Sequence, residues 1–129
     1  MRYRPILPLL VAAVVAFALA LPAAASSSNK WRIQCSEGAK SDGELVFRVD
    51  AGDTAALDIV VAIPKGTSEN QVARRIRDAF KAKLDSARFR VEVDDGEDVL
   101  VKAVGNQKNF TLTLASNSVK AVRIDLDRE

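Results

Sequence analysis

Apolar and polar residues alternate along much of the chain after residue 30, a pattern typical of strands that bury one face. The alternation predicts strands at 31–35, 44–50, 57–63, 88–94, 99–103, 110–114 and 122–126. The segment 57–63 also has apolar residues on its second face, so we expect it to be a central strand. Asp95-Gly96 is typical of a tight hairpin turn between two of the strands.

One segment has the periodicity of a helix. Ser68 and Gln71 fit a capping box, and Glu69 lies where the helix dipole favours an anion. The helix should end between 84 and 86. Its apolar stripe comprises Val72, Ala73, Ile76, Ala79, Phe80 and Leu84.

The order of elements is three strands, one helix and four strands. A single amphipathic helix can cover one face of a mostly antiparallel sheet of about six to seven strands. The sequence therefore predicts one small α+β domain over residues 31–129, after a polar leader at 26–30.

Residues 1–25 have the pattern of a cleavable secretory signal. Arg2 and Arg4 precede an apolar run from Ile6 to Leu21, and Ala23-Ala24-Ala25 supplies the small residues of a cleavage site. Retention as a membrane anchor is the alternative, but the run is short and contains Pro8. We expect an exported protein, periplasmic or secreted, without a stable membrane span after cleavage.

Removal of this segment changes the charge balance. Without Arg2 and Arg4 the 19 basic residues become 17, which equals the 17 acidic ones. The mature chain is formally neutral, so overall charge gives no support for a nucleic-acid partner.

The residue types present exclude several kinds of chemistry. The chain has no histidine and a single cysteine, which rules out histidine-based triads and zinc sites of the usual Cys/His kind. We expect no cofactor and no metal. A small enzyme built on carboxylates such as Glu92, Asp94 or Asp98 is the least favoured reading.

Cys35 has two interpretations. It shares strand parity with Trp31 and Ile33, which favours a buried thiol that packs as a small apolar side chain. The alternative is an intermolecular disulfide, or an exposed reactive thiol, in an oxidising compartment.

Basic residues gather on the polar side of the helix and on the strand after it. A solvated helix face explains them, and a binding surface for an anionic partner is the alternative. The candidate partner-binding residues are Arg74, Arg75, Arg77, Lys81, Arg88 and Arg90.

Residues 94–98 hold four acids around Gly96, which suggests calcium, but the spacing departs from the EF-hand loop. Turn geometry explains Asp95-Gly96 without a metal.

Residues 55–114 resemble a strand–helix–hairpin module of phage tail proteins and some bacterial surface proteins. The resemblance rests on Ile63-Pro64-Lys65-Gly66-Thr67, on the helix stripe from Val72 to Phe80, on the hairpin 89–101 and on 105–114. It implies a structural or assembly module without catalytic residues. The export signal argues against a virion role.

These observations predict an exported, non-enzymatic interaction or structural protein with a protein partner. The alternatives are a binder of anionic surface glycan or lipid through the basic helix face and, last, the carboxylate enzyme.

Overall fold

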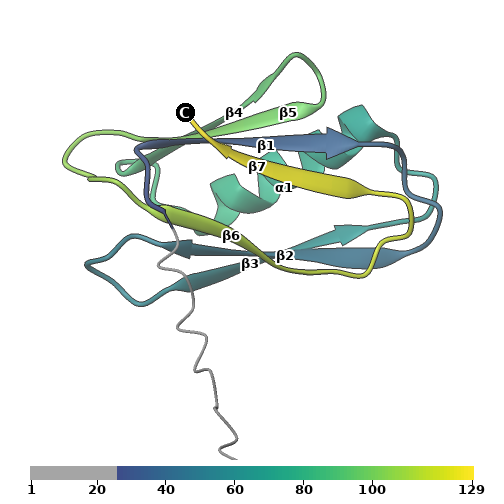
Figure 1. Ribbon diagram of the computed structural model, residues 1–129, viewed down its shortest axis with the longest axis horizontal. Helices are drawn as coiled ribbons and strands as arrows, with labels where there is room; N and C mark the ends of the chain where they lie inside the picture. Colours follow the sequence, from purple (N-terminus) through teal and green to yellow (C-terminus); the bar gives the residue numbers. More distant parts are fainter. Residues whose placement is uncertain (1–25) are drawn as a thin grey trace, which may run out of the picture.

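The computed structural model describes residues 26–129 and has one helix and seven strands (Figure 1). The predicted signal segment, 1–25, lies outside the described residues. The elements are β1 (Lys30–Ser36), β2 (Gly43–Asp50), β3 (Leu57–Ile63), α1 (Glu69–Lys83), β4 (Phe89–Asp94), β5 (Asp98–Ala103), β6 (Thr111–Asn117) and β7 (Arg123–Arg128).

The strands form two antiparallel sheets instead of one. The first has the order β4-β5-β1-β7 and the second β3-β2-β6. The α+β class is confirmed, but the helix does not cover one continuous sheet. The inner faces of the two sheets bury each other, because one helix is too narrow to cover seven half-apolar strands.

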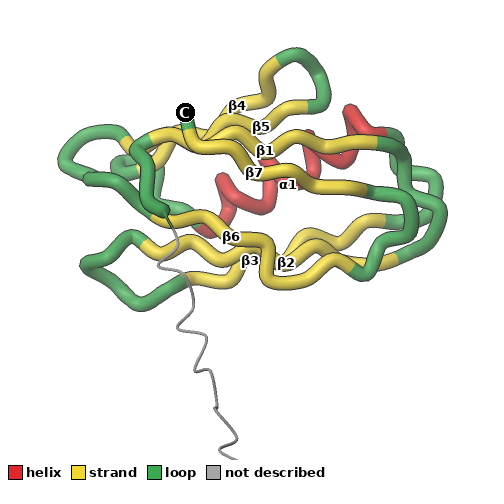
Figure 2. The backbone as a smooth tube through the Cα atoms, viewed as in Figure 1, coloured by secondary structure: helices red, strands yellow, loops and turns green. Residues whose placement is uncertain are grey.

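Helix α1 lies between the two sheets, behind β6 and β7 in the view of Figure 2. It contacts β3 of one sheet and β4, β5 and β1 of the other. Phe80 packs edge-on against Phe47 of β2, with ring centroids 5.2 Å apart. The helix therefore closes the side of the sandwich on which β3 and β4 are the edge strands.

The helix begins as the sequence predicts. Ser68 is the N-cap, its hydroxyl accepts from the Gln71 N–H, and the Gln71 side chain accepts from the Ser68 N–H. Leu84 ends the helix and donates its N–H to the Phe80 carbonyl. All four fully buried helix residues belong to the predicted stripe: Val72, Ala73, Ile76 and Phe80.

One strand lies elsewhere than predicted. β3 pairs only with β2 among the described strands, so it is an edge and not a central strand. Val60 and Ala62 on its second face are exposed, Val60 to 52%. Val60 and Ala62 share the exposed outer face of β3 with Asp58, which pairs with Arg48 of β2, so this face is not buried between two neighbouring strands.

Candidate functional site

The edge strand β4 leaves a row of backbone groups available. β4 pairs with β5, and the Arg88 carbonyl just before it accepts the Val104 N–H. Because an antiparallel ladder alternates, the N–H and C=O groups of Val91 and Val93 point away from β5. The Phe89 N–H points the same way and donates to the Asp85 carbonyl.

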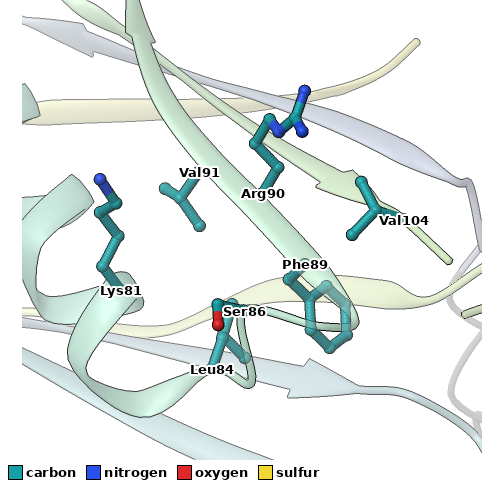
Figure 3. Close-up of a pocket in the computed structure, with 7 residues that line it drawn as sticks. All are labelled: Lys81, Leu84, Ser86, Phe89, Arg90, Val91 and Val104. Carbon is teal, nitrogen blue, oxygen red and sulfur yellow. The ribbon is translucent and has the colours of Figure 1, made fainter.

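A groove of about 330 Å³ lies where this edge begins, between the last turn of α1 and β4 (Figure 3). Its apolar lining includes Phe89 and Val91, both largely buried. Lys81 from the helix and Arg90 from the strand are exposed at its rim. The full lining is Lys81, Leu84, Ser86, Phe89, Arg90, Val91 and Val104.

Helix geometry places more positive charge along the same edge. Arg74, Arg77 and Lys81 follow Asn70 at spacings of three or four residues, so the four share one stripe. A Cβ built on Gly96, in the β4–β5 turn, would lie 3.3 Å from the Asn70 side chain, and Lys81 lines the groove. We call Arg74, Arg77 and Lys81 the basic stripe, and it runs beside β4.

The structure divides the predicted basic surface. Arg75 is exposed but lies about 100° around the helix from Arg74, off the stripe. Arg77 is half-buried and pairs with Asp78 at 3.0 Å. The six residues therefore do not form one surface, and only Arg74, Arg77, Lys81 and Arg90 follow the β4 edge.

Arg88 points elsewhere. It donates to both carboxylate oxygens of Asp53, at 2.7 and 3.0 Å, and to the side chain of Gln107. The Arg88 guanidinium also lies 6.0 Å from the centre of the Phe89 ring. These contacts join the β2–β3 and β5–β6 loops, so Arg88 has a structural role and is not available to a partner.

The candidate catalytic carboxylates are bound by basic side chains. Arg32 Nη1 lies 2.7 Å from Asp98 Oδ2 and 3.1 Å from Asp94 Oδ2, and Lys102 Nζ lies 2.6 Å from Glu92 Oε1. The hydrogen bond from Lys102 lowers the pKa of Glu92, which is unfavourable for a general acid. These contacts give the three carboxylates a structural role on the outer face of the sheet.

The acidic segment forms the predicted turn. Asp95 and Gly96 both have positive φ, 51° and 80°, and Asp94 faces Asp98 across the hairpin. Among residues 26–129, no group of three or more potential metal ligands lies together.

No helix among residues 26–129 is long and apolar enough to cross a membrane.

Cys35 is buried in the core, with 2% of its surface exposed. Burial, with nearby carboxylates as a smaller cause, raises the pKa of its thiol to about 12. An intermolecular disulfide needs a sulfur that a second chain can reach, so the structure favours the buried-thiol interpretation.

Sequence reasoning missed the groove and Arg32. Most residues that line the groove lie between 81 and 91, but the hollow forms only where the end of α1 packs beside β4, and Val104 comes from beyond β5. One feature of the sequence could have indicated the role of Arg32: two acids that face each other across a hairpin need a nearby cation.

Comparisons with known proteins found no family model and no curated protein that match this chain.

Proposed function

We propose that the chain is an exported, non-enzymatic interaction protein that binds an extended segment of a protein partner along the β4 edge. The observation that supports this most is the coincidence of unpaired strand groups at Val91 and Val93 with the groove at Phe89. An added strand gains main-chain hydrogen bonds from such an edge and side-chain pockets from the groove.

The charged residues of the domain fit a binding role better than a catalytic one. The clustered acids on the four-stranded sheet are each in contact with Arg32 or Lys102. The basic residues at the β4 edge include two exposed side chains that line the groove, Lys81 and Arg90. Edge strands are commonly shielded from other chains, whereas this one lies beside an accessible groove.

A proline scan of the edges tests the proposal. The Val91 N–H points away from β5, so Val91→Pro removes a docking group without removing a ladder hydrogen bond. Val60→Pro is the matched control, because it places the same ring on the edge strand β3. Circular dichroism checks that both variants fold.

The readout is a partner captured from an exported-protein extract and then purified. We expect Val91→Pro to lose this partner and Val60→Pro to keep it. Amide exchange on the wild-type complex should also protect Val91 and Val93. If the Val91 and Val93 amides exchange as fast in the complex as in the unbound protein, the proposal is overturned, even if Val91→Pro loses the partner.

The exposed Arg74, Arg75 and Lys81 favour a second candidate, a binder of anionic glycan or lipid through the helix. That function requires salt-sensitive binding to an anionic polymer that Arg74→Glu with Arg77→Glu abolishes and that Val91→Pro leaves intact.

A further inference from the structure

Building on the proposed function, we propose that the β4 edge selects an extended acidic segment of another protein, with apolar residues over the groove floor and carboxylates facing Arg90. Two exposed cations line this groove, and its remaining lining residues, all described, are apolar apart from Ser86. Figure 3 shows Lys81 and Arg90 on opposite sides of the β4 ribbon.

Strand geometry assigns the two kinds of side chain. In a strand added beside β4, successive side chains point to opposite faces of the sheet. Those on the outer face lie next to Arg90, and those on the inner face lie over Leu84, Phe89 and Val91. An alternating acidic and apolar sequence satisfies both faces, with its carboxylates beside Arg90 and its apolar residues over the groove floor. Lys81 lies at the rim of this groove and adds positive charge near the bound segment.

Charge also fixes where the acids lie along the edge. Arg90 is followed on the same face of β4 by Glu92 and Asp94, which are bound to Lys102 and Arg32. Lys102 and Arg32 already pair with these acids, so the Glu92–Asp94 end of β4 does not attract a further carboxylate. The acidic residues of the partner should therefore lie beside the Phe89–Arg90 end.

A second copy of this chain fits the edge less well. Antiparallel pairing of two β4 strands about Val91 would place Arg90 opposite Glu92, which is favourable. The same pairing would bring two basic stripes, each with Arg74, Arg77 and Lys81, toward one another. The helix side thus favours a partner with negative charge over a second copy.

Designed peptides test the selection directly. The probe is a fluorescent peptide of alternating valine and glutamate, compared with a valine–lysine peptide and a neutral valine–threonine peptide. Fluorescence anisotropy gives the affinity, and the backbone amide resonances of Val91 and Val93 report the binding place. We expect the acidic peptide to bind at least about tenfold more tightly than the neutral one.

Matched charge reversals complete the test. Lys81→Glu with Arg90→Glu should abolish the preference for the acidic peptide and create one for the lysine peptide. Arg75→Glu with Lys40→Glu changes the net charge equally at exposed positions away from the groove and should change nothing.

The outcomes separate this inference from the proposed function. Equal binding of all three peptides at Val91 and Val93 overturns the acidic selection and leaves docking at the β4 edge intact. If no peptide shifts these amides and the purified partner also leaves them unprotected, both proposals fail. A heparin fragment that binds the stripe while no peptide binds overturns both in favour of the glycan alternative.

Discussion

Arg32 Nη1 lies 2.7 Å from Asp98 Oδ2, and this contact joins the centre of the four-stranded sheet to the turn of its hairpin. The same nitrogen lies 3.1 Å from Asp94, the residue that faces Asp98 across the hairpin. Two like charges placed opposite each other would otherwise destabilise the β4–β5 pair. Arg32 therefore allows an acidic turn to end the strand whose edge we propose as the binding surface.

Arg32→Leu should destabilise the domain by about 2–3 kcal/mol. The Asp98 side chain is only 11% exposed, so removal of its cation leaves a largely buried charge, although the 42% exposure of Asp94 moderates the cost. Urea denaturation measures the loss.

The double variant Arg32→Leu with Asp98→Asn provides the control. It removes the unpaired charge together with its partner, so it should recover most of the loss. A double variant as unstable as Arg32→Leu alone would show that packing of the Arg32 stem, and not charge, is what matters.

Acid should destabilise the domain through the same network. Arg32, and less strongly Lys30, donates to Glu129 and holds the pKa of that carboxyl below its ordinary value of 4.5. The unfolded chain then binds this proton more readily than the folded one, so the stabilisation is complete above 4.5 and is lost as the pH falls. Melting temperatures from neutral to acid pH should fall less steeply for Arg32→Leu than for the wild type.

Period-two alternation was sufficient to locate the seven strands, because most of them bury one face more than the other, although β5 has buried residues on both faces. β2, for example, buries Leu45, Phe47 and Val49 and turns Glu44 and Arg48 outward. The helix start was equally visible, because a capping box is a local contact between Ser68 and Gln71. Local chemistry therefore predicted the elements and the α+β class.

The pairing of strands could not be read in this way. β6 pairs with β2 and β7 with β1, contacts between residues far apart in the chain. Alternation marks which face is buried but not which neighbour covers it, so it cannot divide seven strands into two sheets. The contacts of Arg88 with Asp53 and Gln107 depend on how the two sheets assemble, which is why the sequence placed Arg88 on the same surface as Arg90.

Cys35 should react slowly with a thiol reagent in the native protein. Its sulfur is buried, and its raised pKa, about 12, leaves almost no thiolate at neutral pH. Ellman's reagent should modify it rapidly only after denaturation. Cys35→Ala with Val60→Cys moves the thiol to a position that is 52% exposed in the wild type and should react at once. Fast native labelling of the wild type would contradict the buried site.

Ser68→Ala should lower the free energy of unfolding by about 1 kcal/mol, because it removes the oxygen that accepts from the Gln71 N–H at the start of α1. Ser86→Ala is a suitable comparison, since Ser86 is exposed beyond the helix end. Thermal denaturation followed by circular dichroism should separate the two variants, and equal melting temperatures would argue against the cap.

Arg88→Gln should affect the stability of the domain and Arg90→Gln the binding of the peptide, although the two residues are only two positions apart. Arg88 holds Asp53 and Gln107 of two loops and lowers the pKa of Asp53, so its loss should reduce the melting temperature. Arg90 is exposed at the groove rim, so its loss should leave the melting temperature unchanged but weaken the binding of the acidic peptide. Parallel measurement of melting temperature and peptide anisotropy tests both expectations. If Arg88→Gln is as stable as the wild type but no longer binds the acidic peptide, Arg88 belongs to the binding surface. That result would contradict the structural role that we assign to Arg88 from its contacts with Asp53 and Gln107.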